Sequence, residues 1–338
     1  MSEPNSAIER AWESLQEGDV ASARRIAERE NRRDPESPEI LLLLAACCRG
    51  DGDPDKAISL LEKASAGAAD WSAPELWIAE ILAEDLDRPA DAVAHAALAL
   101  DRAEEEDEFL DALMLKAGLE IKLGKLKAAR TTLSELPAAD EVELPAALAL
   151  DLAYLFLEAG DGEEARLRFQ MLADAHAEEA EAWYGLGLCA EDRDDETSKR
   201  QAWLRVLDTD AAAAFESAHM SEAEMAEVAE QALTELPERA RKLIENVPIL
   251  VVDLPARDEV ERGLDPRLLG LFTGAAYSDS AALGGAPQVT QILLFRKNLE
   301  RMALDAEDLR EQIRITLLHE TGHFFGMSEE DLAQVGLD

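Results

Sequence analysis

Apolar and polar positions alternate with helical periodicity up to about Ala240, in a region dense in alanine, whereas β-branched and glycine- or proline-containing stretches follow. After this change, the pattern predicts an amphipathic helix over 223–244, three short strands, and a long helix from about Ala306 to Phe325. The strand candidates are Val247–Val252, Leu268–Thr273 and Val289–Phe295. The chain should therefore contain an all-α N-terminal part and a small α/β part with a mixed sheet packed on the long helix.

Two helix starts are marked by capping residues. Ser221 with Glu224 three residues later is a capping-box pattern, and Asp305 precedes the long helix. We expect helical repeats over residues 1–205, a connector over 206–222 and the α/β domain over 223–338.

The N-terminal part repeats a short turn pattern, in which a glycine or aspartate is followed five positions later by alanine. The pairs are Gly18 and Ala23, Gly52 and Ala57, Asp87 and Ala92, Gly124 and Ala129, and Gly160 and Ala165. Successive alanines are 34, 35, 37 and 36 residues apart. A period of this length is typical of a helical solenoid, in which the glycine ends one helix and the alanine lets two helices approach closely.

This region resembles tetratricopeptide repeats. Asp34-Pro35 lies where that family often closes its second helix, and Ala182-Trp183-Tyr184-Gly185-Leu186-Gly187 resembles the opening of a further repeat. The resemblance implies a concave groove for a protein or peptide partner. The acidic surface favours a basic partner, but solvated helix faces are often acidic as well, so both interpretations stay open.

The charge and the cysteine content limit the partners and the cellular compartment to be expected. The chain has 73 acidic and 33 basic residues among 338, a formal net charge of −40, which disfavours binding to nucleic acid or to an anionic membrane surface. Its three cysteines are Cys47, Cys48 and Cys189, an odd number typical of buried thiols in a reducing compartment. No secretory leader or membrane-spanning stretch is evident, so we expect a cytoplasmic protein.

The predicted long helix contains His319-Glu320-Thr321-Gly322-His323. Residues four apart project from the same helix face, so the imidazoles of His319 and His323 can take two corners of one tetrahedral metal site. Glu320 lies about 100° around the helix from His319 and can reach a water at that metal as a general base.

A third ligand is expected from the residues that follow. Gly326 can end the helix in a left-handed conformation and turn the chain back, which brings Glu329 toward the two histidines. The alternative role for Glu329 is that of a first-turn acid interacting with the dipole of a following helix.

The spacing H-E-x-x-H-x-x-G-x-x-E resembles the metzincin pattern with an acid as the third ligand, and residues 223–338 resemble the minimal zincin-like metallopeptidases of bacteria. The resemblance rests on Glu235-Leu236-Pro237, Asn246-Val247, Leu269–Gly274, Ile292–Arg296 and His319–Leu332. It implies one zinc ion per chain held by His319, His323 and Glu329, with Glu320 as the catalytic acid–base. Relatives usually carry aspartate where Glu329 stands, so the reach of this side chain must be adjusted.

Three functions follow from these observations. The first is a zinc-dependent peptidase whose repeats bind a protein or peptide, with an extended substrate adding to a sheet edge at Leu268–Thr273 or Ile292–Phe295. The second is a non-catalytic repeat scaffold whose zincin-like domain binds zinc for stability or sensing. The third is a metal-free site in which the two histidines hydrogen-bond to acids.

Overall fold

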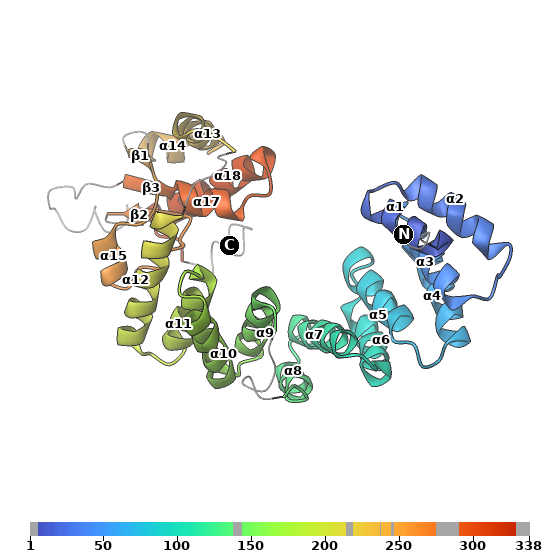
Figure 1. Cartoon of the computed structure of the whole chain (residues 1–338). Helices are drawn as coiled ribbons and strands as arrows, with labels where there is room; N and C mark the ends of the chain where they lie inside the picture. Colours follow the sequence, from blue (N-terminus) through green and yellow to red (C-terminus); the bar gives the residue numbers. More distant parts are fainter. Residues whose placement is uncertain are drawn as a thin grey trace, which may run out of the picture. The chain divides into compact units, whose positions relative to one another are not determined.

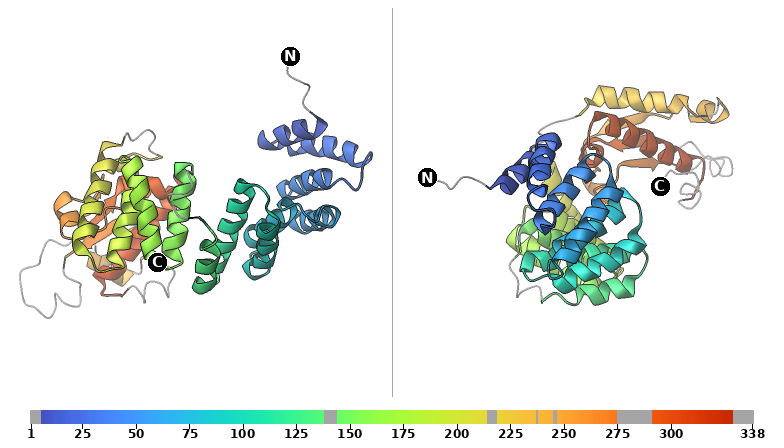
Figure 2. Two further views of the ribbon diagram at one scale, coloured as in Figure 1. Left: turned by 60° about the horizontal axis from the view of Figure 1, so that its bottom comes forward. Right: turned by 90° about the vertical axis from the view of Figure 1, so that its right-hand side faces the viewer.

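The computed structural model describes residues 6–137, 144–213, 219–236, 238–244, 247–274 and 291–328, and it divides into two compact units after Arg168 (Figures 1 and 2). The first unit is helical: α1 Ala7–Gln16, α2 Val20–Asn31, α3 Pro38–Gly50, α4 Pro54–Gly67, α5 Ala73–Glu80 continued by a π-helical turn Ile81–Asp85, α6 Pro89–Arg102, α7 Glu106–Lys122, α8 Leu126–Leu133 and α9 Ala146–Glu158. Helix α10 (Gly162–Ala175) spans the division. The second unit contains α11 Ala180–Glu191, α12 Glu196–Ala212, α13 Glu222–Thr234, α14 Glu238–Ile244, β1 Ile249–Val252, α15 Arg257–Glu261, β2 Gly270–Thr273, β3 Gln291–Phe295, α17 Arg296–Met302 and α18 Ala306–Phe324.

The predicted repeat turns are confirmed. All five turn residues have positive φ: Gly18 79°, Gly52 76°, Asp87 47°, Gly124 69° and Gly160 79°. The five alanines that follow them, Ala23, Ala57, Ala92, Ala129 and Ala165, are each fully buried. A left-handed turn residue and a close helix contact therefore recur together, as the helical hairpins of a solenoid require.

A sixth turn lies in the second unit, where the sequence pattern is displaced. Asp194 has φ 54° between α11 and α12. The two helices approach so closely that a Cβ on Gly187 would lie 2.1 Å from Nε1 of Trp203, which explains the glycine in this segment. Helix α12 continues to Ala212, so residues 206–212, expected within a connector, are helical.

The last helical pair packs directly on the mixed domain. Trp203 and Leu207 of α12 form a buried cluster with Val260 of α15, and Tyr184 and Leu254 pack against it. Residues 169–338 therefore form one compact unit that includes both this helical pair and the sheet.

The sheet has three strands in the order β1-β3-β2, as the three apolar runs predict. β1 pairs with β3 in parallel, with Ile249 opposite Ile292, and β2 pairs with β3 antiparallel, with Gly270 opposite Leu294. Among the described strands, β2 thus lies at an edge of the sheet, whereas β3 is central. The expectation that Ile292–Phe295 offers a free edge is therefore wrong, because both sides of β3 are already paired.

Two helices pack along this sheet and against each other: α13 contacts β1, and α18 contacts β2 and β3. The core between them includes Met225, Ile292, Leu294, Ile313 and Leu317, all nearly or fully buried. The predicted single helix over 223–244 is described as two helices, α13 and α14. The predicted fold, a helical-repeat region followed by a small domain with a mixed sheet, is confirmed.

The three cysteines are buried free thiols. Among the described residues, no helix is both long enough and apolar enough to cross a bilayer.

Candidate metal centre

The helix that presents the candidate site is fixed at its start by Asp305. One carboxylate oxygen of Asp305 accepts hydrogen bonds from the backbone N–H groups of Glu307 (2.8 Å) and Asp308 (2.9 Å). These N–H groups hold the pKa of Asp305 below its ordinary value. This is the N-cap predicted from the sequence, and it satisfies donors that a helix start otherwise leaves unpaired.

The two histidines converge from one face of α18. Nε2 of His323 lies 2.9 Å from Nε2 of His319, and the ring centroids are 4.7 Å apart with the planes inclined by 76°. Two imidazole nitrogens at this distance share a hydrogen bond, so one must donate and the other accept. The predicted pairing of these side chains on one helix face is therefore present.

The end of α18 orients His323. The Met327 N–H donates to Gly322 O (3.0 Å) and the Gly326 N–H donates to His323 O (3.0 Å), the pattern of a Schellman motif. Gly326 has φ 81°, the left-handed conformation predicted for it. The turn brings the Met327 carbonyl within 3.3 Å of Nδ1 of His323. Because a carbonyl only accepts, this contact requires a proton on Nδ1, and in the neutral imidazole the lone pair is then on Nε2.

Glu320 faces the sheet edge. Its side chain is buried, with 8% of the residue exposed, and one carboxylate oxygen accepts the backbone N–H of Phe272 at 2.6 Å. That N–H belongs to the edge strand β2, so the strand backbone holds the carboxylate in a defined orientation. The sequence indicated Glu320, but it did not indicate Phe272 as its partner.

Gly270 allows β2 to lie this close to α18. A Cβ at Gly270 would lie 2.6 Å from Cγ2 of Thr316, 3.1 Å from Cγ of Glu320 and 3.3 Å from the Leu293 carbonyl oxygen. Real Cβ atoms do not approach other atoms to 2.6 Å, so only glycine fits at this position without a shift. In the sequence, Gly270 is part of the family resemblance but gives no indication of this packing role.

The expected third ligand, Glu329, lies outside the described residues, as does the segment after it. Within the described part of the chain, no group of three or more His, Cys, Asp or Glu side chains is arranged to hold a metal ion. The ligand role of Glu329 thus stays a prediction.

Comparison with known proteins assigns both regions. The zincin-like metallopeptidase family matches residues 244–337, and two tetratricopeptide repeat families match residues 14–81 and 150–216. The chain contains tetratricopeptide repeats and a zincin-like domain. No curated protein matches.

Solved structures resemble the repeats. One is PilW, a type IV pilus biogenesis factor, with 18% identity, coverage of 61% of this chain and 93% of that chain, and a TM-score of 0.46. Another is PilF of Pseudomonas aeruginosa, with 16% identity, coverage of 61% of this chain and 91% of that chain, and a TM-score of 0.47. A third is YrrB, described as a tetratricopeptide repeat protein with an unusual peptide-binding site, with 14% identity, coverage of 55% of this chain and 93% of that chain, and a TM-score of 0.45.

The donor set of the zincin-like domain fits a zinc ion. Zinc binds imidazole nitrogens at ~2.0–2.1 Å in tetrahedral geometry, which places two ligand nitrogens roughly 3.3 Å apart. The two Nε2 atoms, 2.9 Å apart, would need to separate by a few tenths of an ångström, and the nitrogen that donates the hydrogen bond between them would have to lose that proton. The Met327 carbonyl already fixes the His323 tautomer that a metal requires.

A polar network connects the edge strand of the zincin-like domain to the last helical pair. In the segment before β2, Arg267 pairs with Glu181 of α11 at 2.6 Å and lies over the Tyr184 ring at 4.7 Å, while the Tyr184 hydroxyl donates to Asp265 at 2.8 Å. The side-chain amide of Asn298 in α17 donates hydrogen bonds to the carbonyls of Pro266 and Leu268, the residues on either side of Arg267.

The centre of this network is Asp210 of α12, a buried acid. It pairs with Arg301 at 2.7 Å and with Arg267 at 3.5 Å. The sequence indicated neither Asp210 nor Arg267, because their partners are distant in the chain.

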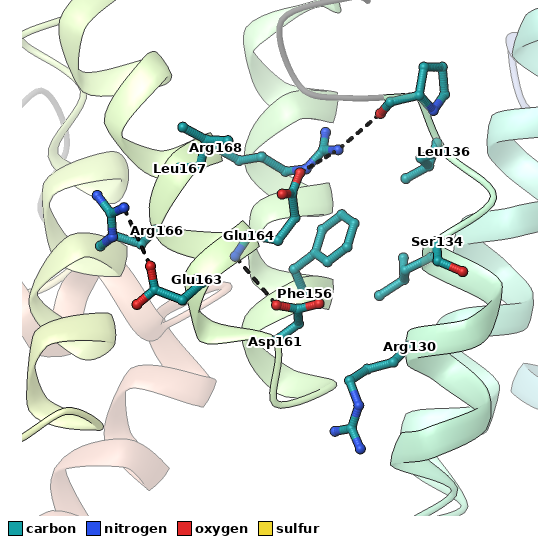
Figure 3. Close-up of a pocket in the computed structure, with 12 residues that line it drawn as sticks. Arg130, Ser134, Leu136, Phe156, Asp161, Glu163, Glu164, Arg166, Leu167 and Arg168 are labelled. Carbon is teal, nitrogen blue, oxygen red and sulfur yellow. Dashed lines mark hydrogen bonds and ion pairs between the residues drawn. The ribbon is translucent and has the colours of Figure 1, made fainter.

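The tetratricopeptide repeats contain a hollow of about 510 Å³ between α8 and α10 (Figure 3). Arg168 pairs with Glu164 at 3.0 Å and lies 4.6 Å from the Phe156 ring centroid, while Arg166 pairs with Glu163 at 3.5 Å. These charged side chains are paired within α10, and the hollow combines them with apolar residues such as Phe156 and Leu133.

Proposed function

We propose that this chain is a zinc-dependent peptidase whose tetratricopeptide repeats bind a protein or peptide partner. The observation that carries this proposal is the arrangement of three side chains on α18. The Nε2 atoms of His319 and His323 converge, and Glu320 beside them is held by the backbone of an edge strand. This arrangement combines a metal-binding pair with an oriented general base, as metallopeptidase chemistry requires.

His319 and His323 would hold one zinc ion per chain, with Glu329 as the proposed third protein ligand. Three protein ligands leave a fourth position open for water or substrate, which is the composition of catalytic zinc sites. When bound, zinc acts as a Lewis acid that polarises a carbonyl and makes a water molecule more acidic.

Glu320 would take a proton from the attacking water and return it to the departing amine nitrogen. Its burial and its hydrogen bond with Phe272 restrict the carboxylate to one orientation, which lowers the entropic cost of placing a base at the reaction. Among the described strands, β2 pairs with β3 on one side, and an extended peptide placed along the other side of β2 would lie close to this carboxylate.

The network around Arg267 and Asp210 would keep this edge strand in place. We propose that α11 and α12 support the zincin-like domain, while the earlier repeats provide the surface that recruits the partner.

The test is Glu320→Gln in the full chain, with Glu311→Gln as the matched control. Both substitutions neutralise a carboxylate on α18, but Glu311 is exposed and pairs with Arg314 one turn away. Hydrolysis of a peptide library should fall by about 10²–10⁴-fold in Glu320→Gln, with zinc content unchanged, and should stay at the wild-type level in Glu311→Gln.

Equal hydrolysis by wild type and Glu320→Gln would remove Glu320 from the mechanism. Zinc binding with no hydrolysis by wild type across the library would favour the non-catalytic scaffold instead.

A further inference from the structure

The lysines of this acidic chain are concentrated in one short segment. Only nine of the 338 residues are lysine, and four of the nine lie between positions 116 and 127. Residues 116–134 contain five basic residues and one acidic residue, a net charge of +4, whereas the whole chain has a net charge of −40. This segment covers the end of α7, the repeat turn and the whole of α8 (Figure 1).

A surface groove of about 600 Å³ lies within this basic segment. Its lining residues come from α7, the turn and α8: Lys116, Glu120, Gly124, Lys125, Leu126, Lys127, Ala128, Thr131 and Thr132. A groove of this size can accommodate a few residues of a peptide.

The acid in this groove is neutralised by groups inside it. Glu120 is buried, accepts the Thr132 hydroxyl at 2.8 Å, and pairs with Lys116 at 3.3 Å. The Lys116 ammonium also contacts the Thr132 hydroxyl. The negative charge of Glu120 is therefore compensated before a ligand arrives.

The rim of the groove is positively charged without such compensation. Lys125 and Lys127 are exposed, and in the described part of the chain neither has an ion pair. Leu126 between them is 39% exposed, one of the large apolar side chains left at the surface. In the other three repeats with a turn glycine, the next residue is an aspartate, Asp19, Asp53 or Asp161, whereas Arg88 follows the turn residue Asp87. Lys125 thus reverses the charge found after the other turn glycines.

We propose that this groove binds an acidic segment of a protein partner, with the carboxylates of the segment facing Lys125 and Lys127 and an apolar side chain packing on Leu126. Charge complementarity supports this occupant, because the basic rim attracts acids while the strong negative charge of the remaining chain repels the extended phosphate backbone of a nucleic acid. The inference rests on the proposed partner-binding role of the repeats and is independent of peptide hydrolysis. It assigns an acidic partner to this groove, whereas the overall charge favoured a basic one.

The test measures fluorescence anisotropy of a fluorescein-labelled peptide composed of Asp, Glu and Leu, titrated with the full chain. The test variant is Lys125→Glu with Lys127→Glu. The matched control is Lys56→Glu with Lys63→Glu, which makes the same charge change at two exposed lysines of α4. We expect the Kd to rise at least about tenfold in the test variant and less than about twofold in the control. The wild-type Kd should also rise as the salt concentration increases from about 50 to 300 mM.

Equal weakening by both double variants would show attraction by net charge alone and would overturn the proposal. Binding of a Lys-and-Leu peptide but not of the acidic peptide would also overturn it, while leaving intact a partner-binding role for the repeats. If a single-stranded oligonucleotide binds more tightly than the acidic peptide, the proposal is overturned and the groove is assigned to nucleic acid. If the chain binds no peptide but self-associates, and this self-association disappears in Lys125→Glu with Lys127→Glu, the proposal is also overturned and the occupant is a second copy of the chain.

Discussion

Replacing Gly270 by alanine tests the close contact between the edge strand and the candidate catalytic helix. The new Cβ would lie 2.6 Å from Cγ2 of Thr316, about 1 Å inside ordinary van der Waals contact. Overpacking of this kind costs about 1–3 kcal/mol, while exchanging glycine for alanine returns ~0.5–1 kcal/mol through the unfolded chain. We therefore expect Gly270→Ala to destabilise the unit of residues 169–338 by about 1–2 kcal/mol.

A second substitution separates this clash from other effects. Thr316→Ser removes the methyl group that the new Cβ would strike, at a cost of about 1 kcal/mol when made alone. Combined with Gly270→Ala, it should relieve much of the clash, so the double variant should be about 1 kcal/mol more stable than the sum of the single effects predicts.

Hydrogen–deuterium exchange of the β3 and α18 amides measures the free energy of opening of this unit separately from the first unit. Gly118→Ala, measured through the α7 amides of the first unit, is the control, because its Cβ would lie 3.9 Å from the nearest side-chain atom, within ordinary contact. Additive effects of Gly270→Ala and Thr316→Ser, or a Gly270→Ala protein as stable as wild type, would refute the proposed packing of β2 on α18.

Three other predictions concern single side chains. Gly326→Ala should cost about 1 kcal/mol, because φ is 81°, and should weaken zinc binding roughly tenfold in a chelator competition by displacing the Met327 carbonyl from His323. Burial raises the pKa of Glu75, but hydrogen bonds from Ser65 and His95 outweigh it and leave the pKa below its ordinary value. A carboxyl whose pKa is lowered on folding stabilises the fold at pH values above its unfolded pKa of about 4.3, and this stabilisation is lost as the pH falls through the folded pKa. In urea unfolding, Glu75→Gln should therefore be less stable than wild type at pH ~7. The difference in the free energy of unfolding should shrink below pH ~4. Burial also raises the pKa of Cys47 to about 11, so at pH ~8 only about one Cys47 thiol in a thousand is ionised, and labelling by a disulfide reagent should require unfolding.

Local patterns in the sequence predicted much of the fold because they reflect local physical requirements. The turn residues are constrained by backbone conformation, so the spacing of glycine and aspartate alone predicted the turns, at which the structure has positive φ. The alanines are constrained by helix contact, and the caps at Ser221 and Asp305 by unpaired N–H groups. The same holds for His319 and His323, because helix geometry alone brings residues four apart together.

Long-range packing could not be predicted in this way. Two contacts depend on the order of the strands in the sheet: the Phe272 N–H that holds Glu320, and the approach of Gly270 to Thr316. The same strand order, with β3 in the centre, corrects the expectation that Ile292–Phe295 offers a free edge. Asp210 pairs with Arg267 and Arg301, which lie 57 and 91 positions further along the chain. A single sequence gives no indication of such a pairing.

The most direct test of a metal centre on α18 is the zinc content of the purified full chain, measured by elemental analysis beside His323→Ala. About one zinc ion per chain in wild type, lost in His323→Ala and reduced in Glu329→Ala, is the predicted result. No zinc in any of the three proteins, even after zinc is added at neutral pH, would contradict the account and leave an acidic repeat protein with two hydrogen-bonded histidines.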